Sequence, residues 1–287
     1  MVLQWHGDRE LDTADLLLSE LHLGATYDAI VRGRLWRRMP FDVIAVPVAI
    51  LAMTYALSFG GFPVLLTSLA LYLGAWHRGR QNFGIARYYQ ARIGGPVSLW
   101  HRRLFTVAIY APMIAGVLYF TGTSPFHEGE EYAGPTLDQG VLFVLGAVAA
   151  TCVAIYLVFT LRHRQQVHPG ERWLVMAQAL SFGSAYVLGA WSVAFILVLV
   201  VHHEVQYLYF TYAMARRGDR QRRAPVVGEL RLLASFALWP LLGLGSWALC
   251  QQFDSEWLPP FLVGGLLCHY WLDGRIWTSR ARRTSAA

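Results

Sequence analysis

The chain has 287 residues, of which 55% are hydrophobic and only 15% are charged. This composition is more apolar than that of a soluble domain of the same length, and it favours a membrane protein. All 24 basic residues are arginines, and they form short clusters between apolar runs rather than a basic arm, so nucleic acid is not expected as a partner. The absence of lysine excludes Schiff-base chemistry and therefore a retinal opsin.

The N-terminal segment, residues 1–38, is polar and charged and does not resemble a cleavable signal peptide. Within residues 9–38, leucines are interleaved with acidic residues, and the last seven positions contain Arg32, Arg34, Arg37 and Arg38. This pattern predicts an amphipathic cytoplasmic helix that either lies against the inner leaflet or covers the cytoplasmic mouth of the bundle. His22 lies among the polar positions of this segment and is expected to be solvated.

Residues 39–277 are expected to form an all-α transmembrane bundle, because apolar runs of roughly 20 residues recur along this part of the chain. The apolar stretch 173–213 is too long for one helix and is interpreted as two helices that turn near Gly189. This gives eight spans, followed by a basic tail at 278–287. The expected spans are 42–59, 62–77, 104–121, 139–161, two within 173–213, 229–251 and 258–273.

The arginines orient these spans. With eight spans and both termini in the cytoplasm, every arginine falls on the cytoplasmic side, as positive-inside topology requires. The outer loops then lie at 60–61, 122–138, about 189 and 252–257, and they contain acidic residues but no arginine. The sequence therefore predicts a multi-pass protein of the cell membrane.

Three of the spans that run toward the cytoplasm end in histidines, each followed four residues later by a polar side chain. An i,i+4 spacing places both members of such a pair on one face of a helix. The same orientation of the three spans puts the histidines at a similar depth, just inside the cytoplasmic interface. The pairs are His77 with Gln81, His202 with Gln206, His203 with Tyr207, and His269 with Asp273.

Imidazoles that several helices contribute at one level can converge on a shared metal ion. A single histidine at a helix end is usually an interfacial side chain, but three occurrences at one depth favour a common centre. We expect metal ligation by His77, His202, His203, His269 and Asp273, with His101 as an extra ligand. Glu204, Gln206, Tyr207 and Gln81 are expected to act in catalysis, by orienting ligands or contacting substrate.

Histidine and carboxylate ligands without thiolate suit iron, and less specifically manganese, copper or zinc. Cys152, Cys250 and Cys268 are scattered and form no CxxC site. Open positions on ferrous iron bind dioxygen, as in sites with two histidines and one carboxylate.

The three motifs, WHxxxQNFG at 76–84, HHxxQY at 202–207 and HYxxDGxIW at 269–277, resemble those of a group of little-characterised bacterial polytopic membrane proteins. In kind, the chain is also similar to the histidine-rich membrane iron oxygenases, which include desaturases, alkane hydroxylases and bacterial carotene-cleaving enzymes. It lacks the HxxxH and HxxHH boxes of the desaturases, so their di-iron geometry does not carry over. The resemblance implies non-haem iron and dioxygen at a membrane-embedded histidine cluster.

These observations lead to one favoured function and two alternatives. The favoured function is a metal-dependent oxygenase with mono- or dinuclear iron, acting with dioxygen on a hydrophobic or aromatic small molecule. The chain has no flavin or nicotinamide fingerprint, so electrons would come from a separate donor or from the substrate. The alternatives are a b-type haem or quinone-linked electron carrier, and a transporter without chemistry.

Overall fold

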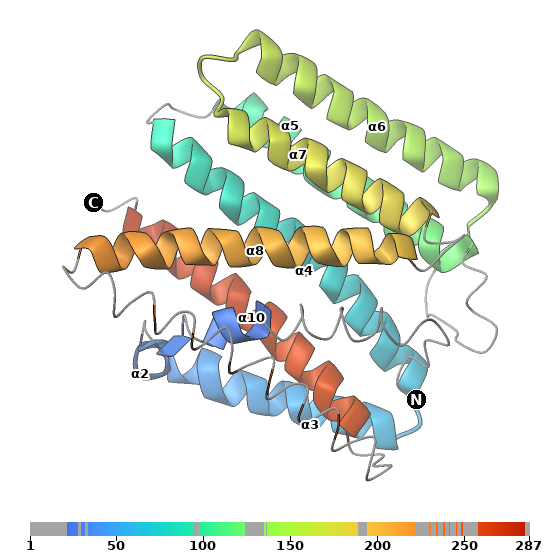
Figure 1. Cartoon of the computed structure of the whole chain (residues 1–287). Coiled ribbons are helices and arrows are strands. Elements are labelled where there is room, and N and C mark those ends of the chain that lie inside the picture. Colours follow the sequence, from blue (N-terminus) through green and yellow to red (C-terminus); the bar gives the residue numbers. More distant parts are fainter. Residues whose placement is uncertain are drawn as a thin grey trace. The chain divides into compact units, whose positions relative to one another are not determined.

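The computed structural model describes residues 22–27, 30–31, 34–93, 98–123, 135, 137–188, 194–221 and 258–284, together with single residues at 230, 234, 238, 241, 245 and 248. The regular elements in these residues are all helical, with no strand among them. The predicted all-α class is therefore confirmed for this part of the chain (Figure 1).

Most predicted spans coincide with a helix, although several helices extend beyond the apolar run. The second predicted span, 62–77, belongs to a helix that continues to Ile93. The stretch 173–213 contains two separate helices, and residues 189–193, where the turn was predicted, lie outside the described residues. Most of the predicted span 229–251 also lies outside them. The helices are α2 (Leu35–Arg38), α3 (Val46–Phe59), α4 (Pro63–Ile93), α5 (Leu99–Thr123), α6 (Gln139–Arg162), α7 (Pro169–Phe182), α8 (Ala194–Gln221) and α10 (Leu258–Thr284).

Two π-helical turns adjoin these helices: η1 (Phe41–Ala45) leads into α3, and η3 (Gly183–Leu188) continues α7. The wider i→i+5 turn is found mostly as single turns within longer helices, often near functional sites. In η1 the turn includes Asp42, a buried carboxylate in an otherwise apolar segment.

Three helical segments are long and apolar enough to cross a membrane: Phe41–Phe59, Leu99–Thr121 and Gln139–Arg162. On α6, large apolar side chains such as Phe143 (78% exposed) and Leu161 (61% exposed) face outward. An apolar helix that exposes such side chains over much of its length is suited to lipid rather than water. The described part of the chain is thus helical and has three helices of the length and composition that membrane spans require; the eight-span topology stays a prediction.

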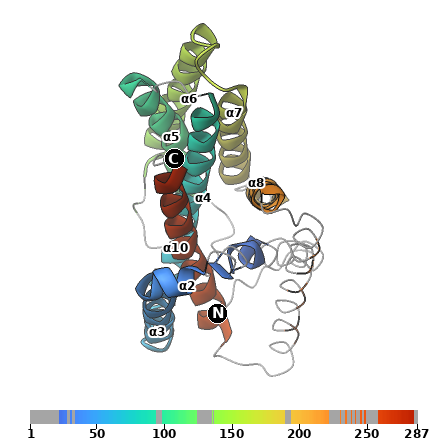
Figure 2. The ribbon, with the colours of Figure 1, turned by 90° about the vertical axis from the view of Figure 1, so that its left-hand side faces the viewer.

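The chain divides into two compact units. Unit 1 comprises Met1–Leu66 and Val200–Ile276, and unit 2 comprises Thr67–Leu199 and Trp277–Ala287. In unit 2, helices α5, α6 and α7 pack side by side (Figure 2). Their core contains aromatic and aliphatic side chains from α4, α5, α7, η3 and α8, namely Ala75, Met113, Val117, Phe120, Phe182, Ala185, Tyr186 and Leu199.

In unit 1, the start of the first predicted span is fastened to α10 by polar contacts. The Arg275 guanidinium lies 2.8 Å from Oδ2 of Asp42, and the indole N–H of Trp271 donates to the Asp42 carbonyl oxygen at 3.1 Å. Close by, Ile30 and Leu35 pack against Leu272 and Ile276. These contacts fix the register of α10, which carries His269 and Asp273.

Helices α3 and α10 are in close contact at Gly264. A Cβ atom at this position would lie 2.7 Å from Cδ2 of Leu51 and 2.8 Å from Oγ1 of Thr54, closer than packed atoms tolerate. The Thr54 hydroxyl donates to the Leu51 carbonyl oxygen at 2.8 Å, so it is not free to move aside. Small residues at such crossings let membrane helices pack backbone to backbone.

Replacing Gly264 with alanine should therefore destabilise the protein by about 1–3 kcal/mol, because the added methyl group overpacks this crossing. The matched control is Gly265→Ala in the same helix, where a Cβ atom meets nothing within 4 Å. This control should be neutral or slightly stabilising, since alanine is the better helix former. Thermal unfolding of the two variants in detergent is the measurement, and equal midpoints would refute the close crossing.

Candidate metal centre

A buried cluster of histidines and carboxylates lies in unit 1, where the N-terminal segment meets α8 and α10. Residues 22–27 are helical, and this turn brings His22 and Thr26 to the cluster. The remaining members are His203, Glu204 and Tyr207 on α8, and His269 and Asp273 on α10. All seven side chains are buried, and Asp273 is fully excluded from solvent at 0% exposure.

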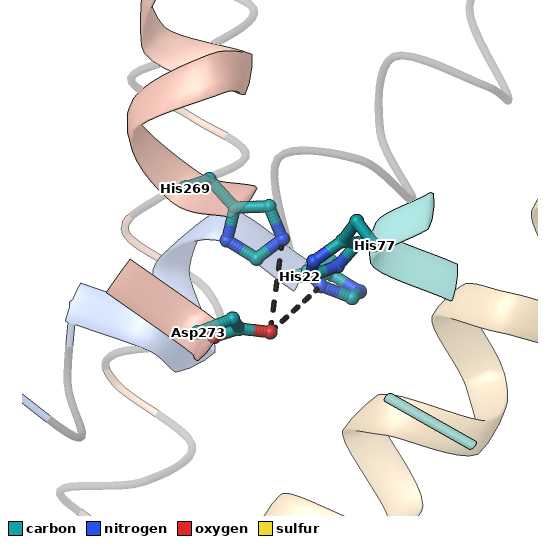
Figure 3. A group of neighbouring side chains, drawn as sticks. All are labelled: His22, His77, His269 and Asp273. Atoms are coloured by element: carbon teal, nitrogen blue, oxygen red, sulfur yellow. Dashed lines mark ion pairs between the residues drawn. The ribbon is translucent and has the colours of Figure 1, made fainter. Parts of the chain in front are cut away.

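Asp273 presents its two oxygens to different partners. Oδ1 accepts hydrogen bonds from the Tyr207 hydroxyl and from the Thr26 hydroxyl, both at 2.7 Å. Oδ2 lies 3.8 Å from Nε2 of His22 and 3.9 Å from Nε2 of His269. Figure 3 shows His269 and Asp273 on α10 with their side chains directed at His22. One oxygen is therefore held in place while the other faces two imidazole nitrogens.

The distances around Oδ2 suit a metal ion. Separations of 3.8 and 3.9 Å are too long for hydrogen bonds. Two ligands with metal bonds of about 2.1 Å lie roughly 3–4.2 Å apart, depending on the angle between them. One ligand atom each of His22, His269 and Asp273 lies within 4.8 Å of the others. The donor set of two imidazoles and one carboxylate therefore fits a first-row metal ion.

Each of the two imidazoles is oriented by a partner on its far side. Nδ1 of His22 lies 2.5 Å from Oε2 of Glu204, and Nδ1 of His269 lies 3.0 Å from Oγ1 of Thr26. The Thr26 hydroxyl has one hydrogen; once this is donated to Asp273, its oxygen can only accept, so His269 must carry its proton on Nδ1. The Nε2 lone pair of His269 then faces Oδ2, an arrangement typical of metal-binding histidines.

The rings of His22, His203 and Tyr207 form a stack. The His22 ring lies 3.9 Å from the Tyr207 ring and 4.7 Å from the His203 ring, centroid to centroid. The His269 ring meets His22 edge-on, with centroids 4.4 Å apart. Ligand atoms of His22, His203 and Glu204 also lie within 4.8 Å of one another, so this side of His22 offers a second donor group.

The two carboxylates dominate the electrostatics of the cluster. Burial lowers the pKa of His22, but the negative charges of Glu204 and Asp273 outweigh burial and raise it from 6.5 to about 9. A buried pair of carboxylates thus attracts a positive charge, which either a proton on His22 or a bound cation supplies.

Several predicted site residues lie elsewhere or on other faces. His77 and Gln81 are buried on α4 in unit 2, and their roles stay predictions. His202 and Gln206 are half-buried on α8, and His202 belongs to neither group of metal donors found among the described residues. His101 lies in unit 2, where its Nε2 is 2.8 Å from Oε1 of Glu171.

The sequence interpretation was wrong about His22, which was expected to be solvated and is only 2% exposed. Thr26 was not singled out either. Their spacing of four residues is the same as in the other histidine pairs, and that similarity could have indicated them. Cys268, which precedes His269, directs its thiol at the Pro47 carbonyl oxygen, 3.5 Å away, so it is not a ligand in this arrangement.

Comparison with known proteins finds no matching family model, no similar curated protein and no similar solved structure. The geometry of the site and the composition of the helices therefore carry the functional argument.

In metal-depleted protein, stability should fall as the pH rises from about 6.5 through about 9. The folded state binds the His22 proton more tightly than the unfolded state, so this contribution is complete below pH 6.5 and is lost above the raised pKa of about 9. His22→Asn should remove this part of the pH dependence. Thermal unfolding in a chelator at a series of pH values, wild type against variant, measures it; parallel curves would refute the raised pKa.

Proposed function

We propose that the protein is a membrane-bound, metal-dependent oxidoreductase whose ion is held by His22, His269 and Asp273. The observation that supports this most directly is the position of Oδ2 of Asp273, 3.8 and 3.9 Å from two imidazole nitrogens. The other polar atoms of all three ligands are occupied by Glu204, Thr26 and Tyr207.

Two histidines and one carboxylate are the ligands of many non-haem iron oxygenases, and iron held in this way supplies open positions for dioxygen. We therefore favour iron, with manganese, copper or zinc as the other ions that accept this donor set. The roles of the protein's own residues follow from the contacts. Glu204 orients His22, Thr26 fixes the tautomer of His269, and Tyr207 holds the ligand carboxylate while its ring covers one face of His22.

His203 is not one of the three proposed ligands, but it lies beside them. Its ring lies against His22, and its donor atom is close to Glu204, so a second ion between His203 and Glu204 would make the centre dinuclear. His77 and His202 stay predicted ligands on sequence grounds. A mononuclear site is favoured because Glu204 contacts His22 directly at 2.5 Å, which is too close for two ligands of one ion.

We place this centre in an eight-span membrane protein with both termini in the cytoplasm. Three helices of spanning length and the lipid-suited surface of α6 support a bilayer setting. A site at the cytoplasmic end of the spans would receive a hydrophobic or aromatic substrate from the inner leaflet. Dioxygen would be the oxidant, and electrons would come from the substrate or from a separate donor protein.

Asp273→Asn and His269→Ala should each abolish stoichiometric metal binding, because each removes one of three ligands. The control is His163→Ala, a histidine on the exposed end of α6. Elemental analysis of detergent-purified protein measures the metal, and a visible spectrum tests for haem in the same sample. Undiminished iron in both ligand variants, or a sharp Soret band, would end this proposal.

Iron with open positions can be separated from a purely structural ion. Nitric oxide binds ferrous iron that has a free coordination position and gives a characteristic electron paramagnetic resonance spectrum. The wild-type protein loaded with ferrous iron should give this spectrum, whereas Asp273→Asn should not. An iron-loaded protein that binds no nitric oxide would indicate a closed, structural site.

Thr26→Val should weaken metal binding about 10- to 100-fold, as is usual when a partner that orients a ligand is lost. The substitution keeps the shape of the side chain but removes the hydroxyl that contacts Asp273 and His269. Thr26→Ser keeps the hydroxyl and should restore affinity. Titration of chelator-treated protein with ferrous iron measures the effect, and equal affinities of the valine and serine variants would refute this role.

A further inference from the structure

Helices α5, α6 and α7 of unit 2 concentrate their charged residues at one end. Residues 104–123 of α5, 139–161 of α6 and 174–182 of α7 contain no charged side chain. The charges lie instead in the first two turns of α5, at the last residue of α6 and just after it, and in the first turn of α7. They belong to Arg102, Arg103, Arg162, Arg164, Glu171 and Arg172.

Buried contacts between the three helices place these ends side by side. Nε2 of His101 on α5 lies 2.8 Å from Oε1 of Glu171 on α7, and the Tyr156 hydroxyl on α6 donates to the same oxygen at 2.9 Å. The Arg172 guanidinium donates to the Thr160 carbonyl oxygen of α6 at 3.3 Å. The start of α5, the end of α6 and the start of α7 therefore lie at one level of unit 2.

The surface of this end carries positive charge. Glu171 is the only acidic residue of the three helices, and its side chain is fully buried. Four arginines are exposed, and none of them forms an ion pair within the part of the chain that the structure describes. Positive side chains that lie together without acidic neighbours create a potential that attracts anions. The four are Arg102, Arg103, Arg162 and Arg164.

Two tryptophans accompany these arginines. Trp100 on α5 is 67% exposed, and Trp173 on α7 is 68% exposed. The Arg103 guanidinium lies over the Trp100 ring, 5.9 Å from its centroid, so the charge and the indole share one patch. Tryptophan has a large apolar ring and one N–H donor, and it is enriched at the headgroup level of bilayers. We refer to the exposed tryptophans and arginines together as the basic rim: Trp100, Arg102, Arg103, Arg162, Arg164 and Trp173.

The apolar surface beside the basic rim favours lipid over an acidic protein as its partner. Ile155, Val158 and Leu161 on α6 are all exposed, and they lead up to Arg162 with the spacing of one helix face. Such a face is suited to acyl chains. Lipid phosphates would then lie where the apolar face ends and the arginines begin.

We propose that the basic rim binds the headgroups of anionic phospholipids at the cytoplasmic surface of the bilayer. Its guanidinium groups donate hydrogen bonds to the phosphates, and its indoles lie between the headgroups and the acyl chains. Anionic lipids are preferred over zwitterionic ones because each exposed basic residue is attracted by their net charge. This inference rests on the membrane setting proposed above and not on the metal centre.

The test measures which lipid lies beside the rim of the full-length protein in vesicles of equal parts phosphatidylglycerol and phosphatidylcholine. In each experiment one of the two lipids is brominated near the headgroup end of its acyl chains, where bromine quenches the fluorescence of nearby tryptophans. The Trp100→Phe/Trp173→Phe double variant gives the signal of the other tryptophans, which is subtracted. Brominated phosphatidylglycerol should quench the rim tryptophans more strongly, and its excess should shrink as the salt concentration rises.

Variants separate the effect of charge from the effect of side-chain shape. In Arg102→Gln/Arg103→Gln, the preference for phosphatidylglycerol should fall about fivefold or more, because each basic residue near an anionic surface contributes on that order. Arg102→Lys/Arg103→Lys keeps both charges and should retain most of the preference. The matched control is Gln165→Ala, a neutral exposed residue in the turn after α6, which should leave the preference unchanged.

Equal quenching by the two brominated lipids in the wild type would overturn the proposal, and so would an excess that survives in the double glutamine variant. If that variant does not fold, as judged by size exclusion, Arg164→Gln in the turn between α6 and α7 decides by the same measurement. Protein that does not float with the vesicles would refute the membrane setting as well. The metal content of the rim variants should equal that of the wild type, so the metal centre is tested separately.

Discussion

The structure of unit 1 depends on a fully buried carboxylate, Asp273. A negative charge in apolar surroundings is tolerated only when donors and positive charge surround it. Its neighbours come from segments far apart in the sequence: Thr26 from the N-terminal segment, Tyr207 from α8 and His269 from its own helix. The charge of one side chain therefore draws three segments together, which apolar packing between membrane helices alone does not specify.

The N-terminal segment gains its position from the same charge. Residues 22–27 make one and a half helical turns, too short to be stable alone. Their position is stabilised by the contacts of His22 with Glu204 and of Thr26 with Asp273. Ile30 and Leu35, which follow in the sequence, pack against two apolar side chains of α10. Metal binding at the proposed centre would therefore be linked to the docking of this segment, since the same side chains would serve both.

Much of unit 1 could be predicted from the sequence because it follows helical periodicity. The spacing of four residues placed His203 with Tyr207 and His269 with Asp273 on common faces, and the apolar runs gave the positions of most helices. His22 could not be placed in this way. In an amphipathic segment, a polar position faces either water or a polar site, and periodicity is the same for both. Whether His22 faces water or a polar site depends on α8 and α10, which lie far from it in the sequence.

Other features could not be predicted from residue patterns either. The π-helical turns η1 and η3 were not predicted, because no residue type or spacing is specific to such a turn. The partner of His101 was also missed. Glu171 is seventy residues away and follows a proline at the start of α7, where an acidic residue is common on account of the helix dipole alone.

The buried polar clusters of the two units contain the same kinds of side chain, but they differ in the distance between imidazole and carboxylate. In each, a tyrosine hydroxyl donates to one oxygen of a buried carboxylate: Tyr207 to Asp273 at 2.7 Å, and Tyr156 to Glu171 at 2.9 Å. In unit 2 the imidazole lies 2.8 Å from that same oxygen, which is too close for both atoms to bind one metal ion. In unit 1 the imidazoles face the other oxygen at 3.8 and 3.9 Å, a separation that two ligands of one metal ion can have. A difference of about 1 Å between imidazole and carboxylate thus distinguishes a direct contact from a spacing that suits a metal ion.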